Sequence, residues 1–239
     1  MKQKLIFLDI DGTLTPPGQN TPPKSALEAI RKARANGHRV FLCTGRNRGM
    51  LAPVLALGFD GAVASAGGFV FTGDKILYDC PMTAEQYQTA MALLGKEGVF
   101  RTVETRDASY CDENLGDFLA GMSSGNSELE RWRAALEKEF NFLVQDGMNH
   151  GVLNGEMINR QFDKGRGVRI MAEALGFDIA DTIGFGDSMN DLEMIETVGV
   201  SVCMDNGSPL LKSKSSMVCP AVDADGLAWA FDRLGLCGE

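Results

Sequence analysis

The sequence has no apolar run that approaches the roughly 20 residues a helix needs to cross a bilayer, so we expect neither a membrane-spanning segment nor a membrane partner. Basic residues are in deficit: 23 lysines and arginines stand against 32 aspartates and glutamates, a net charge of −9. Binding to a nucleic-acid backbone needs a basic face, so nucleic acid is not an expected partner. An acidic protein that binds an anion must concentrate positive charge locally, with a metal, a lysine or helix N-termini.

The six cysteines form no C-x-x-C pair, which is the usual sign of a structural zinc site. We therefore expect no zinc, and we interpret the thiols as reduced, which predicts a cytoplasmic location. The apolar run at residues 5–8 is too short for a signal peptide and meets Asp9 at once. It is typical of a buried strand instead.

Apolar runs alternate with amphipathic patterns over the first 65 residues. Strands are predicted at 4–10, 39–43 and 61–65, and helices at 22–36 and 50–57. The same rhythm returns after Lys164, with helices at 167–175, 191–198 and 225–234 and strands at 182–185 and 200–204. Strands that alternate with helices favour a parallel sheet. We predict an α/β fold, in which residues 1–80 and 157–239 form a Rossmann-like parallel sheet with helices on both faces.

Between these stretches the pattern changes. Residues 69–72 and 75–78 flank Gly73-Asp74 and predict a hairpin. Helices are then predicted at 83–96 and 127–140, each followed by strands. We predict that residues 81–156 form an inserted α+β cap domain with a small core of its own.

The first chemical motif, Asp9-Ile10-Asp11-Gly12-Thr13, directly follows a predicted buried strand. Ligands of open α/β sheets bind at the carboxyl ends of strands, and side chains two residues apart in an extended chain point to the same side. Gly12 allows a sharp turn. A plain Asp-Gly turn is the structural alternative, but the full pattern favours a nucleophile and a proton donor.

The second motif runs from Gly186 to Asp191 and follows the predicted strand at 182–185. If the two strands are neighbours, Asp187 lies beside Asp9, where carboxylates suit Mg²⁺. Capping of the next helix by Asp187 or Ser188 is the alternative, and it is compatible with metal binding.

Two shorter pieces fit beside these motifs. Thr44-Gly45-Arg46 follows a predicted strand, so that a hydroxyl and turn amides can hold a phosphate oxygen. Lys164-Gly165 precedes a helical stretch and can direct an ammonium group at a phosphoryl group. Taken alone, each is more often an ordinary turn or a solvated lysine.

The four motifs in this order resemble those of the haloacid dehalogenase (HAD) superfamily. The insert, which comes after the third strand and before Lys164, is similar to that of the Cof-type phosphatases with a type IIB cap. The segments 198–206 and 224–226 are similar to the tail of that family. One departure is Ser65-Ala66-Gly67-Gly68, where the family often has Ser-Asn-Gly-Ala, so an amide is missing; the insert is also short for its type.

The resemblance implies roles for the motif residues. Asp9 resembles the nucleophile and a magnesium ligand, and Asp11 resembles the general acid/base with its carbonyl on the metal. Asp187 resembles the third protein ligand. Four residues resemble the family's phosphate-binding residues: Thr44, Gly45, Lys164 and Asn190. Asp191 resembles a residue that supports the metal or Lys164.

The resemblance therefore implies a Mg²⁺-dependent phosphatase that hydrolyses a small phosphorylated metabolite, such as a sugar phosphate or phosphorylated cofactor, through an aspartyl phosphate. A phosphomutase or phosphotransferase that uses the same intermediate is the alternative. A non-catalytic phosphosugar-binding protein is weaker, because both Asp9 and Asp11 are present. We expect a monomer or weak homodimer. Five polar residues of the insert are substrate candidates, with a solvated face as the alternative: Arg101, Arg106, Tyr110, His150 and Glu156.

Overall fold

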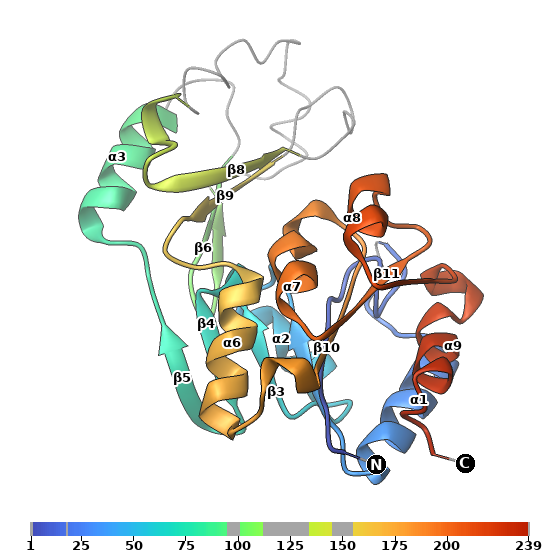
Figure 1. The fold of residues 1–239 in the computed structure, drawn as a ribbon. Coiled ribbons are helices and arrows are strands. Elements are labelled where there is room, and N and C mark those ends of the chain that lie inside the picture. Colours follow the sequence, from blue (N-terminus) through green and yellow to red (C-terminus); the bar gives the residue numbers. More distant parts are fainter. Residues whose placement is uncertain (1, 18, 95–100, 112–133, 145–154, 239) are drawn as a thin grey trace.

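A computed structural model describes residues 2–17, 19–94, 101–111, 134–144 and 155–238. Its centre is an eight-stranded sheet in the order β12-β11-β10-β1-β2-β3-β4-β5 (Figure 1). Six strands run parallel: β1 (Leu5–Leu8), β2 (Arg39–Cys43), β3 (Gly61–Ala64), β10 (Thr182–Gly186), β11 (Val200–Met204) and β12 (Met217–Cys219). The hairpin of β4 (Phe69–Thr72) and β5 (Lys75–Asp79) adds two antiparallel strands at one edge. The predicted α/β fold is therefore confirmed.

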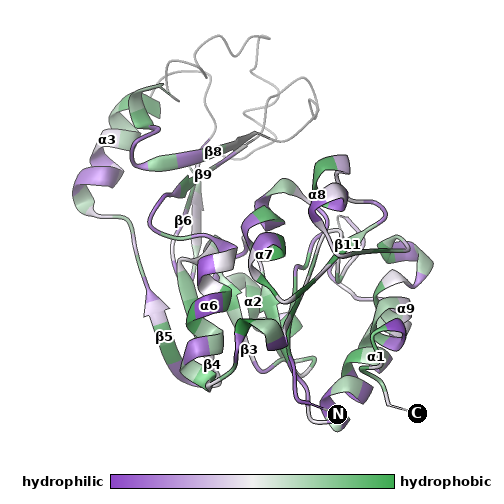
Figure 2. Ribbon diagram, viewed as in Figure 1, coloured by the Kyte–Doolittle hydropathy of each residue, from purple (hydrophilic) through white to green (hydrophobic). Residues whose placement is uncertain are grey.

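Helices cover both faces of the sheet because alternate strand residues point to opposite sides. Ile6 and Leu8 face the side on which α1 (Lys24–Ala35), α2 (Arg48–Leu55) and α9 (Gly226–Arg233) pack. Leu5 and Phe7 face α6 (Lys164–Leu175) and α7 (Leu192–Thr197). Figure 2 shows hydrophobic residues on the central strands and mixed colours on the helices.

A second part of the chain lies outside the central sheet, at the top of Figure 1. It comprises α3 (Ala84–Leu94), the pair β6 (Thr102–Glu104) and β7 (Ser109–Cys111), and the pair β8 (Phe140–Val144) and β9 (Gly155–Asn159). The β6–β7 hairpin rests on the start of α2, where Asn47 Nδ2 donates to Ser109 Oγ at 3.0 Å and Arg48 Nε to Asp107 Oδ1 at 2.5 Å. We propose that this part is the cap.

Several boundaries differ from the prediction. Strand β9 crosses the predicted domain boundary at 156–157, and its pairing with β8 keeps residues 157–159 with the small sheet. Helix α6 begins at Lys164, three residues early, because the side chain of Asp163 caps it by accepting from the Arg166 amide at 2.7 Å. The prediction missed α8 (Pro209–Lys214) and β12. Most of the helix predicted at 127–140 lies outside the described residues.

Short 3₁₀ turns complete the description: Ser65–Gly67, Ile179–Asp181, Met189–Asp191 and Val222–Ala224. Among the described helices, none combines the length and the apolar character that a membrane span requires. The order of the strands has a direct consequence for the site. Because β1 lies between β10 and β2, the loops that follow these three parallel strands meet at one edge of the sheet.

Candidate active site

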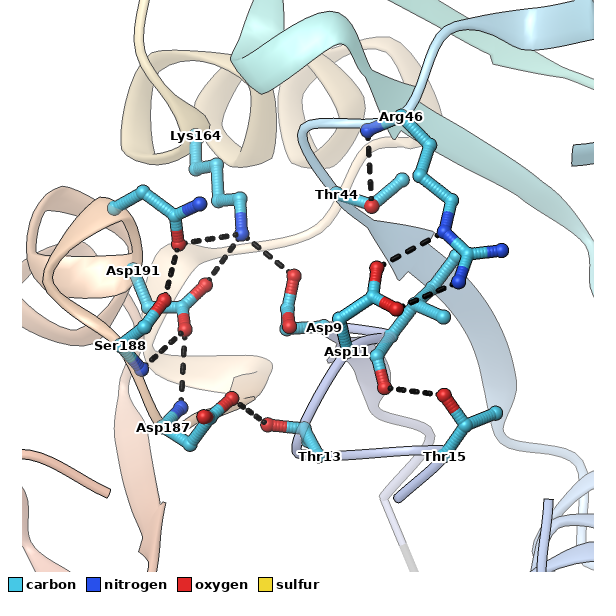
Figure 3. Close-up of polar contacts among 12 residues, drawn as sticks. Asp9, Asp11, Thr13, Thr15, Thr44, Arg46, Lys164, Asp187, Ser188 and Asp191 are labelled. Carbon is cyan, nitrogen blue, oxygen red and sulfur yellow. Dashed lines mark hydrogen bonds and ion pairs between the residues drawn. The ribbon is translucent and has the colours of Figure 1, made fainter. Parts of the chain in front are cut away.

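Asp9 and Asp11 lie in a tight turn that follows β1 (Figure 3). The Asp9 amide still donates to Phe185 O of β10 at 3.0 Å, but the chain then leaves the sheet, so the strand ends before the predicted residue 10. Gly12 supplies a φ of 93° in this turn, a value that favours glycine. Asp9 is only 5% exposed, whereas half of the Asp11 side chain is exposed. The turn thus presents one buried and one accessible carboxylate.

A cavity of about 320 Å³ lies over these carboxylates. Its lining joins the loops after three strands to one residue of the proposed cap: Asp9, Asp11, Thr44, Gly45, Arg46, Ser188, Asn190 and Glu156. Among these, Thr44 is buried, and its Oγ1 accepts from the Arg46 amide at 3.1 Å. The structure therefore brings residues of three of the four sequence motifs to one cavity, as the strand order requires.

The side chain of Lys164 is fully buried and reaches between Asp191 and Asp9 (Figure 3). Its Nζ donates to Asp9 Oδ1 at 2.7 Å, to Asp191 Oδ1 at 2.5 Å and to Asn190 Oδ1 at 3.2 Å. Burial alone would lower the pKa of Lys164, but the carboxylates of Asp191 and Asp9 outweigh it and raise that pKa above its ordinary value. Lys164 is therefore a permanent cation between two buried acids.

Asp191 holds Lys164 and the adjacent loop in place. Its Oδ2 accepts from the amides of Asp187 and Ser188 at 3.0 and 3.1 Å, and its Oδ1 accepts from Lys164. Asp191, rather than Asp187, thus fastens the turn that starts at Ser188. With both oxygens engaged by the protein, Asp191 orients its neighbours.

Asp187 lies next to the turn of the first motif. Its Oδ1 accepts from Thr13 Oγ1 at 2.9 Å. Burial, and then the negative charge of Asp191, raise the pKa of Asp187 to about 7, with the Thr13 hydrogen bond opposing the shift. Burial and the charge of Asp191 also raise the pKa of Asp9 well above its ordinary value, with Lys164 opposing. Protons are retained because negative charge is in excess in the buried site.

The carboxylates fit a hard divalent cation. One oxygen from each of Asp9, Asp187 and Asp191 lies within 4.8 Å of the others. Because Asp191 is engaged by Lys164 and by two amides, Asp9 and Asp187 are the acids of this group that remain free to bind through their second oxygens. Oxygen donors and uncompensated negative charge are what Mg²⁺ and Ca²⁺ require.

Protons should compete with a metal at this site. A cation needs the ionised carboxylate, so the metal-free protein, in which the pKa of Asp187 is about 7, must release protons on binding. We expect the apparent Mg²⁺ affinity to fall at least about fivefold between pH 7 and pH 6. Titration calorimetry at pH 8, 7 and 6 measures this, and buffers of different ionisation enthalpy count the protons released. An affinity that does not vary over this range would contradict the site.

Gly12 is a second test of the same site. A Cβ on Gly12 would lie 2.3 Å from Asp187 Oδ2, so Gly12→Ala must displace this carboxylate. Gly73→Ala is the matched control, because Gly73 also has positive φ, at 52°, but nothing lies within 4 Å. Both variants should lose about 1 kcal/mol of unfolding free energy from backbone strain. Only Gly12→Ala should also lose Mg²⁺ affinity in calorimetry, and equal affinities would contradict this placement of Asp187.

Three residues that the sequence reasoning left without a role belong to the site. Thr13 holds Asp187. Arg46 forms a two-point ion pair with Asp11, from Nε at 2.9 Å and Nη2 at 2.6 Å. Asn206 Nδ2 donates to Gly12 O at 2.8 Å. Thr13 and Arg46 belong to the motifs at 9–13 and 44–46, so the sequence could have indicated a role for them. Asn206 belongs to the segment 198–206, and its position after β11 is the one sequence signal that points to the site.

The five polar residues of the insert that the sequence offered as substrate candidates differ in whether they reach the cavity. Glu156 lines the cavity over Asp9 and Asp11, whereas Arg106 pairs with Asp107 and Asp79 and Tyr110 is 63% exposed. Arg101 does not line that cavity, and His150 lies outside the described residues.

Ala66 stands where the family often has an asparagine, and it lies at a neighbouring cavity. Ala66 has a φ of 53° and lines a second cavity of about 290 Å³, not the one over Asp9 and Asp11. Its amide donates to Thr44 O at 2.9 Å, so this turn supports the loop after β2.

Comparisons with known proteins agree with this geometry. The model of the haloacid dehalogenase-like hydrolases matches residues 6–133 and 112–231. The Bacillus subtilis protein YkrA is 30% identical over 256 residues, which cover 99% of each chain. Its name provisionally assigns it as a phosphatase. A phosphoglycolate phosphatase of Methanosarcina acetivorans is 29% identical and covers 98% of this chain and 97% of its own length.

The fold is similar to a solved structure described as the HAD subclass IIB sugar phosphatase BT4131. The TM-score is 0.79 at 22% identity, over 98% of this chain and 100% of that one. This likeness agrees with the type IIB resemblance of the sequence. Over nearly its whole length the chain belongs to the haloacid dehalogenase-like hydrolases.

Proposed function

We propose that this hydrolase is a Mg²⁺-dependent phosphatase that transfers phosphate from a small metabolite onto Asp9 and then to water. The observation that carries the proposal is Lys164, a buried ammonium whose Nζ lies 2.7 Å from Oδ1 of Asp9, a residue that lines the cavity. A carboxylate that attacks a phosphate dianion meets like-charge repulsion, and a fixed cation beside both groups offsets it.

The reaction has two balanced steps. In the first, an oxygen of Asp9 bonds to phosphorus, the ester P–O bond breaks, and Asp11 gives its proton to the leaving oxygen. In the second, Asp11 takes a proton from water, the water oxygen bonds to phosphorus, and the Asp9–phosphorus bond breaks to release inorganic phosphate. Asp11 is suited to this work because it is the accessible carboxylate of the pair.

Arg46 has to release Asp11 for either step. In the structure both oxygens of Asp11 accept hydrogen bonds from Arg46, so Asp11 is not placed to donate a proton. We propose that this pair opens when substrate enters and that Arg46 holds Asp11 between turnovers. Arg46 Nη1 also donates to Asn20 Oδ1 at 3.2 Å, which keeps the guanidinium at the mouth of the cavity.

The phosphoryl group would lie between Thr44, Gly45, Asn190 and Lys164. The first three line the cavity, and Lys164 Nζ donates to Asn190 Oδ1. Asp9, Asp187 and the Asp11 carbonyl would hold Mg²⁺, which when bound offsets the negative charge of the phosphoryl oxygens and of the nucleophile. The proposed cap would cover the site and exclude bulk water during the first transfer.

The names of the relatives offer two substrate classes, phosphoglycolate and sugar phosphates. A cavity of about 320 Å³ suits a small leaving group of either class. We also infer a reducing, cytoplasmic setting, because all six cysteines are free thiols.

Phosphate release from p-nitrophenyl phosphate tests the proposal. We expect turnover with Mg²⁺, its loss in excess EDTA and its recovery when Mg²⁺ is restored. Full turnover in EDTA would contradict the metal requirement. Product analysis with a second alcohol present separates the phosphatase from a phosphotransferase, because only the latter yields a new ester.

A further inference from the structure

Glu156 is the one residue of the proposed cap, among the described residues, that lines the catalytic cavity. It lies on β9 and reaches toward the loop that follows β2: a Cβ built on Gly45 would lie 3.9 Å from each of its two carboxylate oxygens. Within the part of the chain that the structure describes, no hydrogen bond or ion pair engages this carboxylate. It therefore offers hydrogen-bond acceptors, and no donor, to whatever occupies the cavity.

The cations around this cavity are already engaged. Lys164 is bound to Asp9 and Asp191 at the end where the phosphoryl group is proposed to lie. Arg46, the cation among the lining residues, forms a two-point pair with Asp11. The cap side of the cavity therefore presents an unpaired negative charge. Arg46, the lining cation among the described residues, belongs to the loop after β2 and is paired with Asp11 until substrate enters.

The neighbouring cavity does not present a net positive charge either. Arg160 and Lys164 line it, but so do Glu137, Asp163 and Glu193. Lys164 is already bound to Asp9 and Asp191. The described acidic side chains thus outnumber the cations, and a carboxylate on a leaving group would meet negative charge in that direction as well.

We propose that Glu156 is a specificity-determining residue that selects phosphate monoesters by the charge of the leaving group. A leaving group with hydroxyl or ammonium donors near the ester binds well, because Glu156 accepts hydrogen bonds from them. A leaving group with a carboxylate or second phosphate there is repelled. This inference rests on the proposed phosphatase function, and it favours hydroxylated or amino substrates over phosphoglycolate.

Three phosphate esters with two-carbon leaving groups isolate the charge. The terminal group is an ammonium in 2-aminoethyl phosphate, a hydroxyl in 2-hydroxyethyl phosphate and a carboxylate in 2-phosphoglycolate. With saturating Mg²⁺, kcat/KM should be at least about tenfold lower for phosphoglycolate than for the other two esters. Glu156→Gln keeps the shape and removes the charge, so the difference should shrink to about twofold, mainly through a lower KM for phosphoglycolate.

Glu85→Gln is the matched control. Glu85 is exposed on α3 of the proposed cap, and the variant changes net charge by the same amount without altering the cavity. It should keep the parental ranking of the three esters. In the parent, the penalty on phosphoglycolate should also shrink as ionic strength rises, because salt screens a partly exposed charge.

The outcomes separate the two proposals. If no ester, including p-nitrophenyl phosphate, releases phosphate with Mg²⁺, the phosphatase proposal fails. If esters are hydrolysed but Glu156→Gln leaves the ranking unchanged, or the parent prefers phosphoglycolate, the role of Glu156 is refuted while the phosphatase proposal stands. A preference for phosphoglycolate that Arg46→Gln abolishes would identify Arg46 as the residue that receives the carboxylate.

Discussion

Asp9→Asn should abolish turnover and leave the fold intact. An amide cannot form the acyl phosphate, so phosphate release from p-nitrophenyl phosphate should fall by at least about 10³-fold. The substitution keeps the shape of the side chain and removes the buried carboxyl group of Asp9, whose pKa is already raised. Because Lys164 keeps Asp191 and Asn190 as partners and burial disfavours the charge of Asp9, the free energy of unfolding should change by no more than about 1 kcal/mol. Steady-state kinetics and a denaturant titration measure the two effects.

Asp181→Asn is the control for this variant. Asp181 is also a buried aspartate, but it pairs with Lys2 and Lys4 outside the catalytic cavity. It should retain parental turnover even if some stability is lost. Near-parental turnover by Asp9→Asn would refute the role of Asp9 as nucleophile, whereas acid-stable phosphate bound to the parent and absent from Asp9→Asn in a quenched reaction would support it.

Lys164→Met should have the second large effect, on both stability and activity. The side chain is fully buried between Asp9 and Asp191, and its loss leaves two buried acids without their cation. Breaking such a buried pair costs about 3–5 kcal/mol, which a urea titration of the metal-free protein would measure. Turnover should fall by at least about 10²-fold, because the charge that offsets the incoming phosphate is gone.

The loss of stability in Lys164→Met should depend on pH in a defined direction. In the parent the pKa of Asp9 is already raised by burial and by Asp191, and removal of the opposing lysine raises it further. The folded state then binds more protons than the unfolded state, so stability falls as pH rises above the pKa of an unfolded aspartate. In EDTA, the deficit of the variant should thus be smaller at pH 5 than at pH 8.

Lys24→Met is the control for both measurements. Lys24 is exposed at the start of α1, so its loss should change stability by no more than about 0.5 kcal/mol and leave turnover unchanged. A deficit in Lys164→Met that is independent of pH would mean that the two acids are not the cause of the instability.

Much of the fold and part of the site were predictable from local patterns. Apolar runs that alternate with amphipathic stretches specify a parallel sheet, and the loops after parallel strands meet at one edge. With the further assumption that β10 lies next to β1, this rule predicts Asp9, Thr44 and Asp187 in one place. It could not detect α8 and β12, because six- and three-residue elements carry too little periodicity.

The tertiary structure decided the partners of each charge. Arg46 and Asp11 are 35 residues apart, and Lys164 and Asp9 are 155 apart, so no spacing rule links them. The sequence therefore predicted the acids Asp9, Asp11 and Asp187 and the base Lys164, and the edge of the sheet that holds them, but assigned no role to Arg46. Only the packing of β9 over the loop after β2 brought Glu156 into the catalytic cavity. The physical reason is that a side chain's charge is a local property, whereas its burial and its neighbours depend on segments that only the folded chain brings together.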